Sequence, residues 1–199
     1  MSFVDGFYTF NIDLVNVENN IYDKLFFKLA KHPNESFEML LNKALAYCHA
    51  YKKELTFSEG FYSPEDPTIW EKDVIGNIIS WIQVGVPSYK KTSRAIKQNK
   101  QASFKIYFCS NEEPRNFCYD FRSVKTKSFN KIKFFSIDSN FVENLALHIS
   151  SRINWQISFI DNLLYLHQDK LEFESKIEEV DIWKIYQETI SEVQSKAVL

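Results

Sequence analysis

One stretch of the sequence carries basic side chains at a spacing that could place them against phosphate groups. Lys90, Lys91, Arg94 and Lys97 follow one another closely, and positions 90, 94 and 97 share one face of a helix. Such a face is usually only solvated. Because an apolar segment typical of a central strand precedes it directly, the face could equally hold the phosphates of a nucleic-acid backbone.

Carboxylate and amide side chains form the second candidate group. Glu35 and Glu38 lie at the start of an expected helix, Asp66 lies in a rigid acidic loop, and Gln83 lies at the carboxyl end of the expected central strand. The simpler interpretation is that the negative charges of the glutamates stabilise the helix start by interacting with the helix dipole, and that Asp66 fixes a turn. The spacing alone favours this interpretation.

Several other chemistries are excluded or disfavoured. With only 4 glycines the chain has no glycine-rich phosphate-binding motif, so dinucleotide and P-loop chemistry are improbable. The 4 histidines stand at no metal-ligand spacing, and Cys48 lies in the apolar stripe of a helix, where it would pack rather than react. A net charge of −2 gives no global attraction to nucleic acid or anionic lipid, so any such attraction must be local.

Length and composition indicate an ordinary globular protein. A chain of 199 residues, 45% hydrophobic and 25% charged, is typical of one domain or two small ones. The 3 cysteines are widely spaced and suggest a reducing compartment. The amino end lacks the features of a secretory signal, and no run is long enough to span a membrane. We therefore expect a cytoplasmic protein without a membrane segment.

The elements that must position the candidate residues can be read from periodicity. Residues 77–85 are apolar on both faces, as expected for a central strand, and a basic helix over 88–99 and a strand over 102–109 follow. A strand, a helix and a strand in this order predict an α/β or α+β sheet. Further elements are expected as strands near 7–17, 25–30, 54–61, 130–137, 153–160 and 162–167, and helices near 36–51, 139–149 and 181–196.

Motifs spread over the first half of the chain resemble those of the YaeQ family. The segment His32-Pro33-Asn34-Glu35 with Glu38 resembles its H-P-S-E-x-x-E-R helix start, and residues 55–60 resemble its L-x-F-[ST]-x-G strand. Asp66-Pro67 through Trp70 resembles [DE]-P-x-x-W, and residues 81–87 resemble W-I-E-x-G-x-P. Lys91 and Arg94-Ala95 fall where the family places R-x-x-K-A. Weaker similarity continues to Trp183.

The resemblance implies a fold and a site. The fold would be the restriction-endonuclease-like PD-(D/E)XK core, a mixed sheet flanked by helices, with an N-terminal hairpin and a C-terminal amphipathic helix. One domain would span 1–199, with 181–199 as an extension. In the implied site Glu38, Asp66 and Gln83 would hold Mg²⁺, and Glu38, Gln83, Lys91 and Arg94 would take the catalytic positions of phosphodiester hydrolysis.

Two departures from the family pattern bear on this site. The family's D-x-W-I-E places two acids on one face of the central strand, where this chain has Ile79 and Gln83. Mg²⁺ prefers anionic oxygen ligands, and Gln83 offers only a neutral carbonyl oxygen. We therefore expect weak or lost nuclease activity, with binding of nucleic acid through Lys90, Lys91, Arg94 and Lys97 or of a protein partner retained.

Two alternatives remain open. One is an Mg²⁺-dependent nuclease whose ligands have moved to another element, with Glu59 or Asp66 compensating for the missing acids. The other is an interaction module whose terminal helix, with Ile182, Tyr186, Ile190 and Val193 on one face, docks a protein partner.

Overall fold

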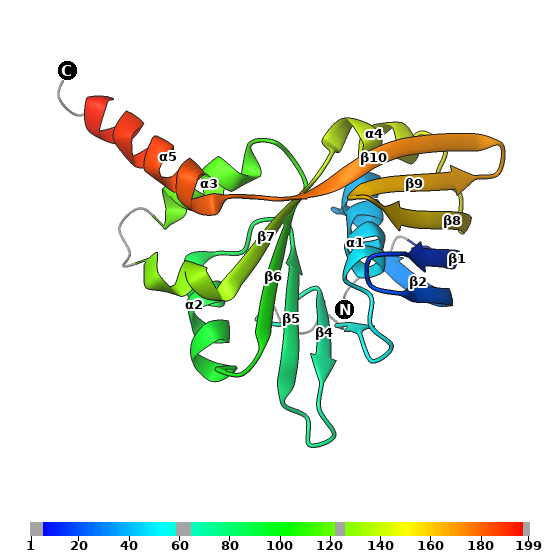
Figure 1. The fold of residues 1–199 in the computed structure, drawn as a ribbon, viewed down its shortest axis with the longest axis horizontal. Helices are drawn as coiled ribbons and strands as arrows, with labels where there is room; N and C mark the ends of the chain where they lie inside the picture. The colour runs from blue at the N-terminus through cyan, green and yellow to red at the C-terminus, as the bar shows by residue number, and fades with distance from the viewer. Residues whose placement is uncertain (1–5, 59–64, 122–125, 197–199) are drawn as a thin grey trace. The chain divides into compact units, whose positions relative to one another are not determined.

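The computed structural model describes residues 6–58, 65–121 and 126–196 of the chain. The chain divides into two compact units, each built from two separate stretches of sequence. The first unit contains the chain up to Tyr51 together with Ile137–Glu178, and the second contains Lys52–Ser136 together with the chain from Glu179 (Figure 1). Each unit has a mixed sheet flanked by helices, so the fold is a mixed α/β fold.

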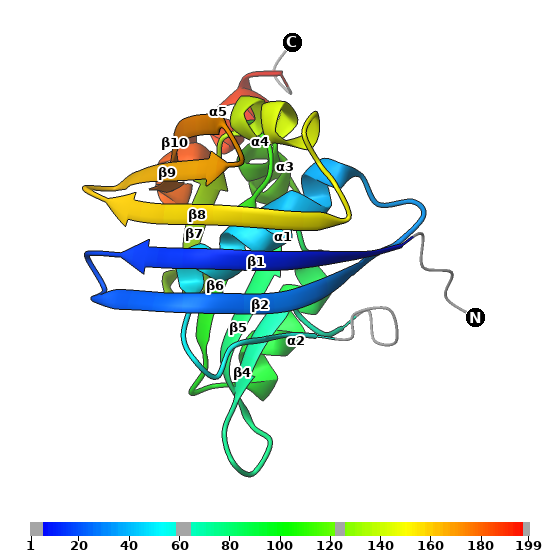
Figure 2. The ribbon, with the colours of Figure 1, turned by 90° about the vertical axis from the view of Figure 1, so that its right-hand side faces the viewer.

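The sheet of the first unit begins with the expected N-terminal hairpin. Its order is β2-β1-β8-β9-β10 (Figure 2). β1 pairs with β2 antiparallel and with β8 parallel, while β9 is antiparallel to both β8 and β10. The strands are β1 (Gly6–Asn16), β2 (Ile21–Lys31), β8 (Arg152–Ile160), β9 (Leu163–Gln168) and β10 (Leu171–Glu179).

Two capped helices complete the first unit. α1 (Phe37–Ala50) starts at Ser36, whose hydroxyl accepts from the Met39 amide, and α4 (Ser139–Ala146) starts at Asp138, whose carboxylate accepts from two amides. From Phe10 onward, alternate residues of β1 are buried to 2% exposure or less, and the Phe10 ring lies 5.3 Å from that of Trp155. The core of this unit therefore lies on one face of its sheet.

The second unit holds the strand, helix and strand that the sequence predicts. Its sheet has the order β7-β6-β5-β4-β3. β5, β6 and β7 are parallel, and β3 and β4 add antiparallel pairs at the other edge. The strands are β3 (Thr56–Phe57), β4 (Ile69–Lys72), β5 (Ile78–Val84), β6 (Ser103–Phe108) and β7 (Ile132–Ile137), and α2 (Tyr89–Gln98) links β5 to β6.

An aromatic core lies between this sheet and its helices. The helices are α2, α3 (Glu113–Asp120), a 3-10 turn (Thr126–Lys131) and α5 (Ile182–Lys196). Trp81 of β5 and Phe104 and Phe108 of β6 are buried in one cluster with Ala95 of α2 and Phe117 of α3. In Figure 2, α2 lies on one face of the sheet, and the residues of this cluster define that face.

Most of the predicted elements are confirmed. Strands appear close to 7–17, 77–85, 102–109 and 153–160, and helices close to 36–51 and 88–99. The expected hairpin turn at Asp161 and Asn162 has both residues at positive φ, 53° and 64°, as a type I′ turn requires. β5 is central, with a strand on each side, although Ile79 near its start is 38% exposed.

Other elements differ from the prediction. The strand expected over 54–61 is confined to Thr56–Phe57 among the described residues, and 59–61 lie outside them. β4 and β10 were not predicted at all: β4 has only four residues, while the apolar alternation of β10 is interrupted at Ser175. None of the described helices combines the length and the apolar composition needed to cross a membrane.

Candidate functional site

The turn between β5 and α2 fixes where the basic residues begin. Gly85 follows the last strand residue with φ 78°, a conformation that favours glycine, and its amide donates to the Tyr107 carbonyl at 2.9 Å. Ser88 then caps α2, since its hydroxyl accepts from the Lys91 amide at 3.3 Å. The sequence therefore starts the basic helix directly at the carboxyl end of a central strand.

Three of the four basic side chains share one surface. Lys90, Arg94 and Lys97 are exposed, and they line an open hollow of about 450 Å³ with uncharged neighbours. The other residues of this hollow are Tyr89, Ser93 and Gln98. The hollow is therefore lined by cations and neutral groups, with no carboxylate among its lining residues.

Lys91 has a different environment from the other three. It is half-buried, and burial lowers the pKa of its ammonium group, while the carboxylates of Glu65 and Asp66 partly offset that effect. Arg94 also contacts this loop, because its Nη1 lies 2.9 Å from Oε2 of Glu65. Both partners are about half-exposed, so this pair stabilises the fold by at most about 1 kcal/mol. Arg94 can therefore readily exchange Glu65 for another anion.

The acidic loop is fastened to the end of β5. The Val84 amide donates to the Thr68 hydroxyl at 3.1 Å, and the Ser58 amide donates to the Thr68 carbonyl at the same distance. The Ser58 hydroxyl also donates to the Pro67 carbonyl. The structure therefore brings Asp66, Lys91 and Arg94 to the same end of β5.

Gln83 and Ile79 do not form an ordinary magnesium site. The Gln83 amide nitrogen donates to the Val84 carbonyl at 2.8 Å, and its buried Oε1 has no hydrogen-bond partner in the described part of the chain. That oxygen is neutral, and Ile79 has no donor atom. Among the described residues no three His, Cys, Asp or Glu side chains gather as metal ligands would. The donors on β5 therefore do not fit the Mg²⁺ that the resemblance implies.

The two glutamates of the helix start lie in the first unit. Glu35 pairs with Lys43 and accepts from the His32 amide at 3.2 Å, so it organises the start of α1. Glu38 lies in the first turn of α1 and is half-buried. Because Gln83 and Asp66 belong to the second unit, a cleft shared by Glu38, Gln83 and Asp66 stays a prediction.

The predicted apolar face of the terminal helix packs on its own chain. Ile182 is 4% exposed, and Tyr186 lies 5.9 Å from Phe129, ring to ring. α5 packs against α3. Ile190 is half-buried, and the Val193 side chain lies outside the described residues, as does Glu59. The part of this face that the structure describes is therefore occupied within the second unit.

Burial accounts for Cys48 as the sequence suggested. Its side chain is 0% exposed in α1, and burial strongly raises the pKa of its thiol. A thiol that stays protonated and enclosed is not a nucleophile. Cys48 therefore serves packing.

Sequence reasoning missed a second basic group in the second unit. Lys105 of β6 is half-buried, and burial lowers the pKa of its ammonium group, with further contributions from Lys52 and Lys133. The alternation Ser103, Lys105, Tyr107 against buried Phe104 and Ile106 could have placed Lys105 on one face of the strand. Its nearness to Lys133 depends on the pairing of β6 with β7.

Comparison with solved structures shows the same fold. The structure is similar to the crystal structure of the YaeQ protein from Pseudomonas syringae, with a TM-score of 0.74 and 20% identity over 88% of this chain and 95% of that one. It is also similar to the YaeQ protein from Xanthomonas axonopodis pv. citri, with a TM-score of 0.77 and 17% identity over 87% and 96% of the two chains.

Sequence comparison agrees with the structural one. The chain is 20% identical over 163 residues to the uncharacterized protein YaeQ of Escherichia coli (strain K12), covering 82% of this chain and 88% of that protein. Its identity to the YaeQ protein of Salmonella typhi is 21% over 155 residues, 78% and 84% of the two chains. The family model described as YaeQ protein matches residues 1–177, and this chain therefore belongs to the YaeQ protein family.

Proposed function

We propose that this protein binds nucleic acid through the phosphate backbone at the exposed face of α2. One observation carries the proposal: Lys90, Arg94 and Lys97 line one hollow, whose lining includes no carboxylate. Lysine and arginine are the usual phosphate-binding side chains, and contacts to phosphates position a protein without reading sequence. The expected activity is therefore binding with little sequence preference.

The charge distribution supports a local site. The whole chain has a net charge of −2, so the general surface does not attract a polyanion. Arg94 forms an ion pair with Glu65, but both side chains are about half-exposed. A phosphate group can therefore replace Glu65 as its partner at a small cost in free energy. Lys90 and Lys97 are fully available to a ligand, since no described side chain forms an ion pair with either.

The proposal includes the loss of metal-dependent cleavage. The resemblance implies a restriction-endonuclease-like core, and the succession of β5, α2 and β6 beside an antiparallel β4 supports it. Ile79 and Gln83 stand where that family has acids, and they supply no anionic oxygen to Mg²⁺. Lys91 and Arg94 then contribute to phosphate binding and not to hydrolysis.

A second candidate function rests on the acidic loop. Asp66 and Glu65 lie near Lys91 at the carboxyl end of β5, and carboxylates beside a lysine are the groups a relocated Mg²⁺-dependent nuclease would need. This alternative differs from the first in one measurable property, which is cleavage that depends on the metal ion.

A cleavage assay separates the two functions. Wild type is incubated with single- and double-stranded DNA and RNA in Mg²⁺ and in Mn²⁺, beside Glu38→Ala and Asp66→Ala. We expect little metal-dependent cleavage by any of the three proteins. Robust cleavage by wild type that either substitution abolishes would replace the binding function with the nuclease.

Binding itself is tested by gel shift at low salt. Replacement of Lys90, Arg94 and Lys97 by Ala should remove most of the affinity. The matched control replaces Lys28, Lys170 and Lys184, which are exposed elsewhere, and changes the net charge equally. Equal shifts for the two triple variants, or no shift with wild type, would contradict the proposal.

A further inference from the structure

We infer that the second unit has a separate site for a compact phosphate-type anion, formed by Lys105 and Lys133 on the face of its sheet opposite α2. The site is independent of the nucleic-acid face of α2, because the two lie on different faces of the sheet. Its ligand would be a phosphate monoester or free phosphate, bound by ammonium groups as point charges.

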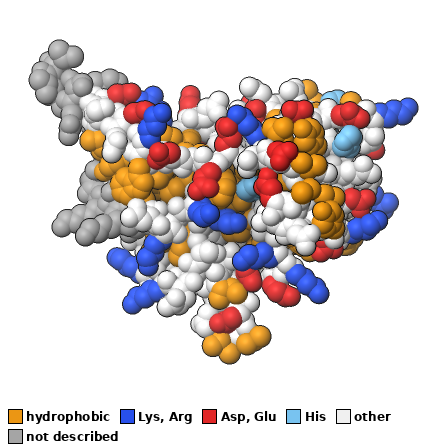
Figure 3. Space-filling view, in the orientation of Figure 1, with side chains coloured by type: hydrophobic (Ala, Val, Ile, Leu, Met, Phe, Trp, Pro, Cys, Tyr) orange, Lys and Arg blue, Asp and Glu red, His pale blue; other side chains and the backbone are white. Residues whose placement is uncertain are grey.

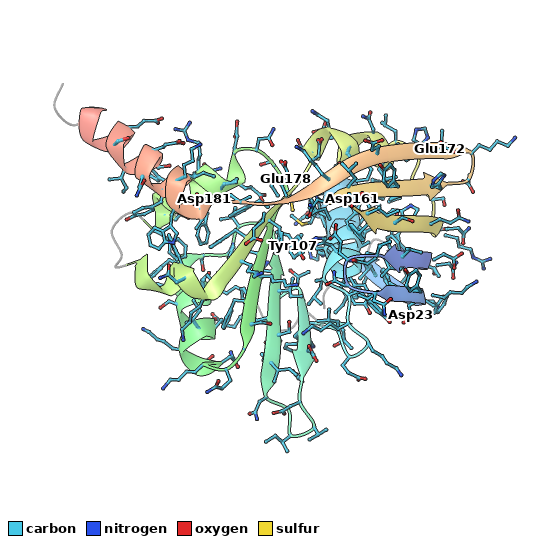
Figure 4. All side chains as sticks on the ribbon, in the orientation of Figure 1. Asp23, Tyr107, Asp161, Glu172, Glu178 and Asp181 are labelled. Carbon is cyan, nitrogen blue, oxygen red and sulfur yellow. The ribbon has the colours of Figure 1, made fainter. Side chains whose placement is uncertain are left out.

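Strand alternation places the central lysine. Phe104 and Phe108 of β6 point into the aromatic core beneath α2 and α3, so Lys105 between them projects from the opposite face. Tyr107, which Figure 4 labels on β6, follows on that same opposite face. Lys105 therefore does not belong to the surface that carries Lys90 and Arg94.

Strand register brings the second lysine beside the first. Lys105 pairs with Lys133 in the parallel ladder of β6 and β7, so their side chains leave the same face of neighbouring strands about 5 Å apart. Like charges in this position destabilise a sheet. In Figure 3, which views this face, blue side chains lie over β6 and β7.

One acidic group close to this face is already engaged. Glu71 of β4 lies 3.5 Å from Lys52, oxygen to nitrogen, and its side chain is only 14% exposed. Neither Lys105 nor Lys133 has a carboxylate partner in the part of the chain that the structure describes. Burial and the charges of Lys52 and Lys133 lower the pKa of Lys105, in agreement with the lack of a carboxylate partner among the described residues.

The surroundings of Lys105 would strengthen its hold on an anion. Its Nζ lies 5.9 Å from the centre of the Phe135 ring, and its ladder neighbour Ile82 is 1% exposed. Apolar neighbours lower the local dielectric and raise the strength of a charge pair.

The geometry favours a small multivalent anion. A half-buried ammonium beside an exposed one offers two charges on adjacent strands, whereas the α2 stripe spreads its charges along a helix. Inorganic phosphate and pyrophosphate serve as probes of the shared phosphate chemistry. A short oligonucleotide without terminal phosphates tests whether a phosphodiester backbone can occupy the site.

The experiment measures ligand-induced stabilisation of the full chain. Phosphate and pyrophosphate should raise the Tm of wild type above sodium chloride of equal ionic strength, whereas the oligonucleotide should not act through Lys105. Lys105→Met should weaken the apparent affinity at least tenfold, and Lys133→Gln several-fold. The triple replacement of Lys90, Arg94 and Lys97 should leave phosphate stabilisation unchanged, which separates this site from the α2 face.

Two variants keep the test decisive. Lys105→Met removes an uncompensated charge, so it should fold with a Tm at least equal to that of wild type without phosphate. If it does not fold, Lys133→Gln decides alone. The proposed site would be wrong if phosphate does not raise the Tm of wild type. It would also be wrong if phosphate raises the Tm of both variants as much as that of wild type.

Discussion

Lys105 lies directly opposite Lys133 across the parallel pairing of β6 and β7. No described carboxylate forms an ion pair with either lysine, and the nearby Glu71 pairs with Lys52. Two like charges at neighbouring strand positions, one of them half-buried, oppose folding. The chain thus keeps an arrangement that costs stability, which is typical of binding sites.

Replacement of Lys105 by Met should stabilise the protein without ligand. The methionine keeps most of the apolar volume and removes both the desolvation of the ammonium group and its repulsion by Lys133 and Lys52. We expect a gain of about 1 kcal/mol at pH 7, measured by urea denaturation. A loss of stability of that size would show that another group compensates the positive charge of Lys105 in the folded protein.

The same variant should also change the pH dependence of stability. The pKa of Lys105 is lowered from 10.5 in the folded protein, so between the folded value and 10.5 the unfolded chain holds more protons on this group. Stability should therefore rise with pH in that window, as Lys105 loses its charge. The stability difference between Lys105→Met and wild type should shrink as the pH approaches 10.5, and a constant difference would contradict the direction of the shift.

Acids restored on β5 should create metal affinity. The family pattern has its two acids where this chain has Ile79 and Gln83, so Ile79→Asp with Gln83→Glu would restore both carboxylates. We expect Mn²⁺ to bind at least tenfold more tightly than to wild type, as measured by calorimetry. Ile79→Asn in the wild-type background is the control of equal shape without charge. Equal Mn²⁺ affinity in all three proteins would show that β5 does not face a metal position.

The aromatic core should depend strongly on Phe129. Its ring is 1% exposed and contacts Phe117, Phe134 and Trp183 at 5.4 to 6.1 Å between ring centres. Phe129→Ala should cost about 3–5 kcal/mol in chemical denaturation, because it leaves a cavity between the sheet and α5. Tyr119→Ala, at a ring that is 47% exposed, is the control and should cost far less. A small loss at Phe129 would mean that α5 is not part of this core.

The elements around the α2 site could be read from the sequence because their signals are local. The apolar run ending at Val84, the stop at Gly85 and Pro87, and the basic segment that follows predict β5 and α2 closely. β10 was not predicted from the sequence. Leu171, Phe173 and Ile177 follow the alternation of a strand, but Ser175 and the surrounding glutamates interrupt the apolar pattern. β4 is too short for periodicity to be seen.

The lysine site could not be predicted in the same way. Alternation within β6 places Lys105 on a face, but its neighbours come from β7 and from Lys52, far away in sequence. Register between strands depends on packing of the whole sheet and is not a local property. The nearness of Lys91 to Asp66 could not be predicted either, because it depends on the hydrogen bond that holds the acidic loop at Thr68.

The most direct test of the proposed function is the salt dependence of nucleic-acid binding. Affinity of wild type and of the Lys90, Arg94 and Lys97 triple alanine variant for duplex DNA is measured by fluorescence anisotropy from 20 to 200 mM salt, roughly the range in which counterion release is resolved. Each neutralised phosphate contributes about −0.9 to the slope of log K against log salt, so wild type should show a slope of about −2 to −3. The triple variant should bind at least tenfold more weakly at low salt and show a slope near zero. Equal affinities and equal slopes for the two proteins would contradict the account.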